Sequence, residues 1–187
     1  AEALLVTGRE LTAKVRLGAP ELVQEAAHRA LGLRVLRGGR QAVCHTADFA
    51  EPALAAFAAD TAHLAGLAEP DPDAGPPAPE ALATSWPDLD LHDGAVASLD
   101  ADRALAMALG GEQAARDHDG RITNSEGASC SVAAGQRLLV TSGGFSGAYR
   151  GTSVTLVVEP VADDAEGKKR NGTWWDSRRH LSALASP

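Results

Sequence analysis

The sequence predicts an α+β fold with a mainly antiparallel sheet, built from two β-meanders with helices packed on one face. Strand-like segments gather in the first and last thirds of the 187 residues, and helical patterns occupy the middle. Strands that are grouped apart from helices are typical of antiparallel sheets. The hydrophobic content is 44% but the aromatic content only 4%, so Ala, Leu and Val must build the core.

The first meander is predicted over residues 3–46. Residues 11–18 (LTAKVRLG) alternate between apolar and polar side chains, as a half-buried strand does. Residues 21–30 (ELVQEAAHRA) fit a strand, although their Ala and Glu content is also compatible with a helix. Gly38 and Gly39 stand between two apolar runs, which indicates a tight hairpin turn with positive φ.

A helix is predicted after this meander. Asp48 and Glu51 have the spacing of a capping box, and Pro52 is tolerated in a first turn. We expect the apolar stripe of this helix to cover one side of the meander. The stripe consists of Leu54, Phe57, Thr61 and Leu64.

A proline-rich loop and a second helix follow. Six of the ten prolines fall within residues 69–88, and no regular element is expected at that density. Trp86 is expected to pack this loop onto the body of the protein. Ser98 is expected to cap the second helix, in which Gly110 and Gly111 indicate close packing or a bend.

The second meander is predicted from three segments. Residues 129–144 suit one or two strands, and residues 147–162 suit a long strand with alternating apolar side chains. Residues 167–177 are expected to pair back after an acidic turn. Ser177 is expected to cap a short final helix.

Charge and composition argue against a nucleic-acid-binding protein and against a transmembrane protein. A net charge of −8 disfavours a nucleic-acid partner, since phosphate binding needs a concentrated basic surface. No apolar run is long enough for a transmembrane helix, and a cytoplasmic location without membrane contact is expected. Cys44 and Cys130 are expected to be reduced thiols.

No motif for catalysis or metal binding is complete. The six histidines lack the His-x-x-x-His spacing of a zinc helix. Residues 142–148 (SGGFSGA) do not match a nucleophile elbow around Ser146, because the pattern breaks at Ala148. Asp88, Asp90 and Asp93 could bind a cation or act as acid and base, but a solvated loop is favoured.

The stretch RITNSEGASC, residues 121–130, concentrates residue types that are common in active sites. No general base, oxyanion donor or metal ligand has a useful spacing to it. Asn124, Ser125 and Gly127 are the residue types that a turn from a helix into a strand requires. We therefore expect a structural turn rather than a catalytic loop.

Five stretches in order resemble the N-terminal domain of the TldD/PmbA family, also described as modulators of DNA gyrase, with the PmbA side fitting best. They are GLRVLRGGRQAVCHTADF (32–49), SWPDLDLHD (85–93), RITNSEGASC (121–130), GAYRGTSVTLVV (147–158) and GTWWDSRRHLSAL (172–184). The resemblance makes residues 1–187 a single domain of this type, with the connecting loop at about 69–88. It implies a second, C-terminal domain that is expected to be absent here.

The resemblance implies a zinc-dependent peptidase system of the bacterial cytosol that acts on unfolded peptides. It places the zinc ligands, a His-Glu-x-x-x-His motif, in the missing domain of TldD-type subunits. No position of this chain matches them, so whether it is an enzyme is left open. The implied partners are a TldD-like subunit or a second copy, together with an extended peptide.

Two functions are compared. The first is a non-catalytic domain for subunit assembly and peptide access, in which a strand edge pairs with the peptide through Tyr149, Arg150, Thr152 and Ser153. The second is a protein-binding module that acts on a partner such as DNA gyrase. A hydrolase that uses Ser146 or Cys130 is disfavoured, and Asn124, Ser125 and Gly127 count as a family signature.

Overall fold

A computed structural model describes residues 1–186, and the chain divides into two compact units. Unit 1 contains residues 1–7, 28–90 and 136–149. Unit 2 contains residues 8–27 and 91–135, and the chain from Arg150 onward. Strands β1, β2, β4 and β5 contribute residues to both units, so neither unit is continuous in sequence.

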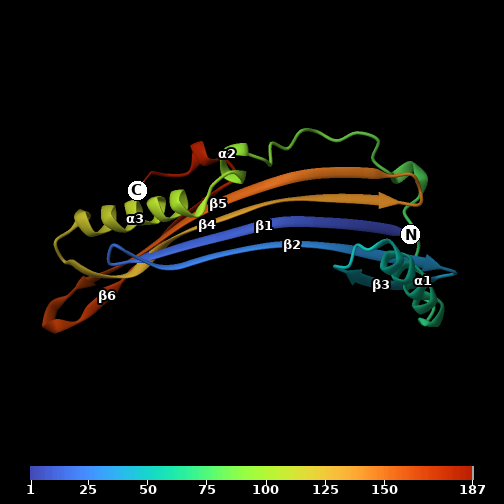
Figure 1. Cartoon of the computed structure of the whole chain (residues 1–187), viewed down its shortest axis with the longest axis horizontal. Helices are drawn as coiled ribbons and strands as arrows, with labels where there is room; N and C mark the ends of the chain where they lie inside the picture. The colour runs from blue at the N-terminus through green and yellow to red at the C-terminus, as the bar shows by residue number, and fades with distance from the viewer. Residues whose placement is uncertain (187) are drawn as a thin grey trace. The chain divides into compact units, whose positions relative to one another are not determined.

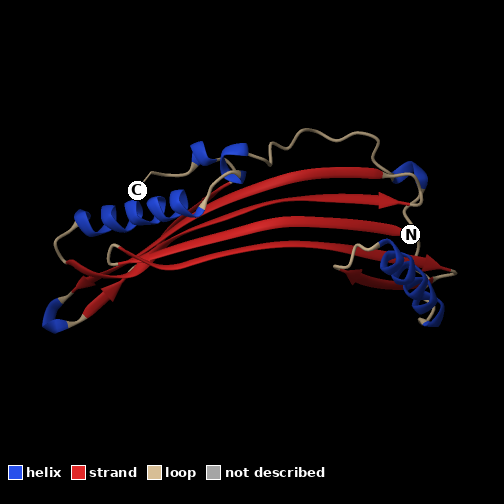
Figure 2. Ribbon diagram, in the orientation of Figure 1, coloured by secondary structure: helices blue, strands red, loops and turns tan. Residues whose placement is uncertain are grey.

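One sheet holds seven strands in the order β3-β2-β1-β4-β5-β6, and β7 also pairs with β5 (Figure 1 and Figure 2). The strands are β1 (Glu2–Arg16), β2 (Ala19–Arg37), β3 (Arg40–Thr46), β4 (Ile122–Thr141), β5 (Ser146–Asp163), β6 (Lys169–Asn171) and β7 (Trp174–Arg178). The helices are α1 (Glu51–Leu67), α2 (Gly94–Ala97) and α3 (Ala101–His118). Among residues 1–186, no helix has the length and apolarity needed to cross a membrane.

The two predicted meanders are confirmed, and they join through β1 and β4. The β2–β3 hairpin turns at Gly38 and Gly39, whose φ angles are 57° and 71°. In unit 2, the hydroxyls of Thr12 and Ser131 lie 3.0 Å apart across β1 and β4. β6 and β7 both pair antiparallel with β5, as predicted for the segment after the acidic turn. The α+β class with a mainly antiparallel sheet is therefore confirmed.

In unit 1, α1 packs against β3 and buries Thr61 and Ala65. The predicted capping box is wrong. Ala50 is the N-cap and makes no side-chain cap bond, because the Asp48 carboxylate accepts instead from the Ala50 N–H at 2.9 Å. Leu64, predicted in the buried stripe, is 47% exposed.

The proline-rich segment has one short 3₁₀ turn, at Pro79–Ala81, and is otherwise irregular. As expected, Trp86 packs onto unit 1. Its ring centroid lies 6.1 Å from that of Phe145, with the ring planes tilted by 50°.

Unit 2 contains the hydrophobic core, which lies between α3 and one face of β1, β4 and β5. Alternate residues of each strand point into it, as a half-buried strand requires. The strand residues of the core are Leu11, Ala13, Val15, Ala128, Cys130, Val132, Val154, Leu156 and Val158. Because the aromatic content is low, the sheet side of the core consists of small and medium-sized side chains, which pack against α3.

Two predicted helix caps are wrong. Asp100, not Ser98, caps α3 by accepting from the Arg103 N–H at 2.9 Å, while Ser98 ends α2. Ser177 caps no helix, because it lies in β7 and its hydroxyl lies 2.8 Å from that of Thr155. Between β7 and residue 186, the chain forms a 3₁₀ turn at Leu181–Ala183 and no α-helix.

The predicted turn over Asn124–Gly127 is also wrong, because β4 begins at Ile122 and includes this segment. The turn from α3 lies before it, where the Asp119 carboxylate accepts from the Arg121 N–H at 2.9 Å. Gly127 has a φ of 118°, and a Cβ there would stand 2.5 Å from the carbonyl oxygen of Val15. A close approach of β1 to β4, rather than a turn, therefore requires this glycine.

The glycine pair in α3 gives a matched test of the core packing. A Cβ at Gly110 meets nothing within 4 Å, whereas a Cβ at Gly111 would lie 3.0 Å from Val158 Cγ2. We expect Gly110→Ala to raise the free energy of unfolding by about 1 kcal/mol through helix propensity. Gly111→Ala should gain less or lose stability, since Val158 must move. Urea unfolding of both variants checks this, and equal gains would contradict the packing of α3 on β5.

Candidate functional site

The four predicted peptide-contact residues all lie in β5 but are not equivalent. Tyr149, in unit 1, is 49% exposed, and its hydroxyl accepts a hydrogen bond from Arg137 at 3.0 Å. In unit 2, Arg150 is exposed, Ser153 is half-buried and Thr152 is buried. Tyr149, Arg150 and Ser153 remain predicted contacts.

Both the backbone N–H and the hydroxyl of Thr152 are hydrogen-bonded inside unit 2. Its backbone N–H donates to the carbonyl of Leu91, and its hydroxyl donates to the carbonyl of Arg179, both at 2.9 Å. The same hydroxyl accepts from the Asp93 N–H at 2.9 Å. A peptide therefore cannot pair with β5 at Thr152 unless it displaces the segment that contains Leu91.

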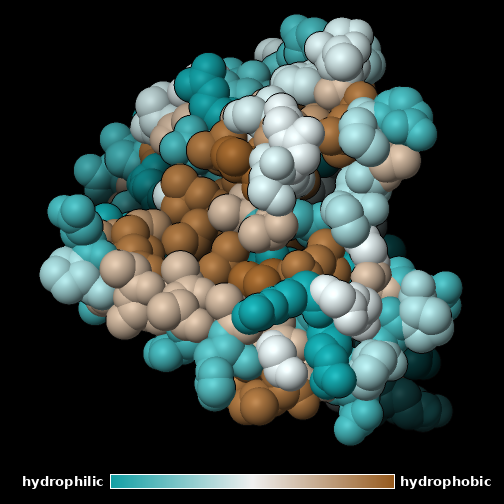
Figure 3. Space-filling view, turned by 90° about the vertical axis from the view of Figure 1, so that its right-hand side faces the viewer, coloured by the Kyte–Doolittle hydropathy of each residue, from teal (hydrophilic) through white to brown (hydrophobic). Residues whose placement is uncertain are grey.

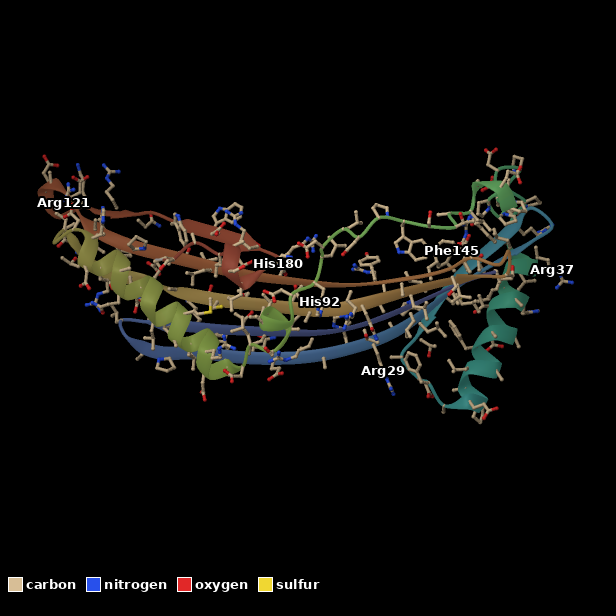
Figure 4. The ribbon with its side chains drawn as sticks, turned by 90° about the horizontal axis from the view of Figure 1, so that it is seen from above. Arg29, Arg37, His92, Arg121, Phe145 and His180 are labelled. Atoms are coloured by element: carbon tan, nitrogen blue, oxygen red, sulfur yellow. The ribbon has the colours of Figure 1, made fainter. Side chains whose placement is uncertain are left out.

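Asp93 connects α2 with the C-terminal segment. Its carboxylate accepts from the Leu181 N–H and from the Ala95 N–H, each at 2.8 Å. These two bonds, in that order of effect, lower the pKa of Asp93, and nearby His180 and His92 add to the shift. Figure 4 labels both histidines, which come from the segment before α2 and from the turn after β7. The carboxylate is thus used to hold backbone, as an N-cap does.

The three aspartates of the loop take part in separate backbone hydrogen bonds. Asp88 accepts from the Asp90 N–H at 3.0 Å within the exposed loop, whereas Asp93 faces Leu181. Within residues 1–186, no group of three or more His, Cys, Asp or Glu side chains is placed to hold a metal. The zinc that the family resemblance implies therefore does not fit a site formed by residues 1–186.

Glu112 of α3 is a buried carboxylate, only 2% exposed, at the end of the β1–β2 hairpin. It accepts from the Leu17 N–H at 2.8 Å and the Gly18 N–H at 2.7 Å. Both residues of this turn have positive φ, 51° and 78°. A positive φ is unfavourable for a leucine. The two bonds from Glu112 offset that cost.

Ser125 extends this network into the RITNSEGASC stretch. Its side chain hydrogen-bonds to Glu112 and accepts from the Gly127 N–H at 2.9 Å. Burial raises the pKa of Glu112, but the bonds from Ser125, Gly18 and Leu17 together lower it below its usual value. The carboxylate is therefore charged and satisfied inside unit 2.

The two nucleophile candidates have no activating neighbour in the described contacts. Cys130 is fully buried in the core, and this burial raises the pKa of its thiol to about 11. A thiol of that kind behaves as a small apolar side chain. Ser146 is exposed at the first position of β5.

Sequence reasoning missed Glu112, although a signal was present. Glu112 follows Ala104 and Ala108 at intervals of four residues, on the helix face that is otherwise apolar. A single charge on an apolar stripe needs a buried partner. The partner could not be read from the sequence, because it is backbone of the distant β1–β2 turn.

Comparison with known proteins identifies the class. Residues 1–65 match the model of the PmbA/TldA metallopeptidase domain 1, and residues 95–186 match that of the central domain. The fold and these matches define part of a metallopeptidase-family protein. The chain belongs to the PmbA/TldD family.

Two curated relatives support this family assignment. The chain is 31% identical over 177 residues to the metalloprotease PmbA of Escherichia coli O157:H7, and 30% identical to the PmbA homologue of Haemophilus influenzae. Each match covers 95% of this chain and 39% of the relative. The chain thus spans about two fifths of the length of these relatives.

Solved structures share the fold. A candidate modulator of DNA gyrase from Bacteroides thetaiotaomicron matches 99% of the chain with a TM-score of 0.87 at 22% identity. TldE from Thermococcus kodakarensis matches 98% with a TM-score of 0.84 at 16% identity. The match covers 42% of the first structure and 40% of the second.

Glu112→Gln tests the buried carboxylate. We expect the free energy of unfolding at pH 7 to fall by about 2 kcal/mol, because a charge-assisted acceptor of two N–H groups is replaced by a neutral amide. Glu126→Gln, at an exposed position of β4, is the matched control and should change little. Urea unfolding monitored by circular dichroism measures both.

The stability difference between the wild type and Glu112→Gln should depend on pH. The pKa of Glu112 is lower in the folded state than its ordinary value of 4.5. The charged carboxylate therefore contributes its full share to the free energy of unfolding above that pH. That contribution is lost as the pH falls through the lowered folded-state pKa. The stability difference between wild type and Glu112→Gln should therefore shrink in acid. A difference that does not change between pH 7 and pH 3 would contradict the charged state assigned to Glu112.

Proposed function

We propose that this chain is a non-catalytic part of a PmbA/TldD-type metallopeptidase and serves subunit assembly and peptide access. One observation supports this most. The buried or capping carboxylates bind backbone N–H groups: Glu112 holds the β1–β2 turn, Asp93 holds Leu181, and Asp176 holds the Ala185 N–H at 2.8 Å. These groups are used to build structure rather than to face a substrate.

A role in assembly is supported by the apolar surface of unit 1. Val43 is 70% exposed and Leu67 is 67% exposed. Figure 3 views the side on which α1 and β3 lie, and hydrophobic residues gather in the middle of this view with hydrophilic ones around them. Surfaces of this kind are typical of protein contacts. The proposed partner is a TldD-like subunit or a second copy of this chain, and the proposed location is the cytoplasm. Zinc would be bound by a TldD-type subunit and not by this chain.

The proposal is tested by a peptidase assay with a quenched fluorescent unfolded peptide and a zinc chelator. The chain alone should give no chelator-sensitive cleavage, and it should co-elute with a TldD-type subunit in size-exclusion chromatography. A mixture of complete TldD-type and PmbA-type subunits is the positive control. Chelator-sensitive cleavage by the purified chain alone would overturn the non-catalytic assignment.

A second candidate function is binding to DNA gyrase, which the description of the Bacteroides structure favours. The net charge of −8 permits a basic protein surface as partner. A pull-down with purified gyrase subunits separates the two functions. Stoichiometric capture of gyrase without co-elution of a TldD-type subunit would favour the second.

A further inference from the structure

The outer edge of β2 in unit 2 lacks a neighbouring strand. β3 pairs with β2 only from Leu31 to Arg37, and β1 is the neighbour on the other side. Within the described chain, residues 19–27 therefore present one row of backbone N–H and C=O groups outward without a strand beside it. Such a row can accept an additional strand.

Every residue from Ala19 to Ala27 is exposed, whereas Leu11, Ala13 and Val15 of neighbouring β1 are buried. Leu22 is 45% exposed and Val23 is 48% exposed. As successive residues of a strand, they lie on opposite faces of the sheet. A strand added here would find an apolar side chain on each face.

This edge carries few of the features that protect edge strands. Pro20 stands only at its start, and residues 19–27 include no lysine. The two charged residues of this edge, Glu21 and Glu25, form ion pairs with residues of the neighbouring strand β1. Glu21 pairs with Lys14 and Glu25 pairs with Arg9, each at 2.6 Å.

The edge is also held in place before any partner arrives. Glu112 fixes the turn at Leu17 and Gly18, and the ion pairs to Lys14 and Arg9 fix the strand that follows. A preformed edge reduces the entropy lost on binding. By contrast, the outer side of β5 in unit 2 is occupied by Leu91 at Thr152, by β7 at Val154–Val158 and by β6 at Val161–Asp163.

We propose that Ala19–Ala27 of β2 is a docking edge for an extended peptide of neutral or basic character, which binds as an added strand. This inference rests on the proposed role in peptide access and moves the contact from β5 to β2. Main-chain hydrogen bonds would provide affinity across many sequences. Leu22 and Val23 would favour small apolar side chains opposite them.

Charge selects a peptide over a second copy. Residues 19–27 contain two glutamates and neither lysine nor arginine. Pairing of two such edges would bring four glutamates into one short interface. The ion pairs to Lys14 and Arg9 reduce the repulsion between these like charges but do not remove it, since Glu21 and Glu25 stay 41% and 55% exposed. A peptide with lysine or arginine would instead place a second cation beside Glu21 or Glu25, whose carboxylates already pair with Lys14 and Arg9.

The test uses a fluorescein-labelled decapeptide in which threonine and valine alternate around two lysines, with binding to the 187-residue chain followed by fluorescence anisotropy. We expect saturable binding that weakens at least tenfold when alternate backbone nitrogens of the peptide are methylated. Replacement of both lysines by glutamate should also weaken binding at least tenfold.

Val23→Lys should weaken binding of the basic peptide at least tenfold, and Leu22→Lys repeats the test on the other face. Val140→Lys is the control, at a 41% exposed position of β4, which has a strand on each side. Both edge positions are exposed, so the melting temperatures should stay close to that of the wild type.

Equal binding of the methylated peptide, or of the Val23→Lys and Leu22→Lys variants, would overturn the proposal. So would a chain that binds no peptide and forms a dimer that Val23→Lys dissociates, because the edge would then belong to a second copy. These results leave the chelator assay and the co-elution with a TldD-type subunit unaffected. Failure of the docking edge is thus distinguishable from failure of the proposed function.

Discussion

The structure of unit 2 depends on one buried carboxylate. Glu112 lies on the apolar face of α3 and binds the N–H groups of Leu17 and Gly18, which form the β1–β2 turn. Through the side chain of Ser125 it also reaches β4. One side chain thus joins the central helix to the hairpin and to the second meander, so its charge fixes three elements that are distant in sequence. A buried charge is stable only with such complete pairing.

The position of this network leaves the first half of β2 outside the core. The core between α3 and the sheet covers β1, β4 and β5, while every residue of β2 from Ala19 to Ala27 is exposed. Because the β1–β2 turn is held from inside by Glu112, the exposed strand needs no cover of its own to stay in place. Asp93 acts in a comparable way at α2, where it holds the chain after β7. The carboxylates of unit 2 stabilise the fold, and the proposed peptide contact involves a strand edge instead.

The sequence predicted the class, the two meanders and the Gly38-Gly39 hairpin, because periodicity and turn chemistry are local. It failed where the deciding contact is distant. Asn124–Gly127 has turn-like composition, yet Gly127 is needed for the approach of Val15 across the sheet. Ser177 resembles a cap, yet it pairs with Thr155. The predicted contact at Thr152 could not be judged from the sequence, since its hydrogen bonds to Leu91 and Arg179 depend on the path of the chain.

Amide hydrogen exchange at single-residue resolution tests the central role of Glu112 most directly. In the native protein, the Leu17 and Gly18 amides, although they lie in a surface turn, should exchange as slowly as amides of the core strands. In Glu112→Gln they should exchange at least tenfold faster, together with the Gly127 amide that Ser125 binds. Fast exchange of Leu17 and Gly18 in the wild type, or rates that the substitution leaves unchanged, would contradict this account.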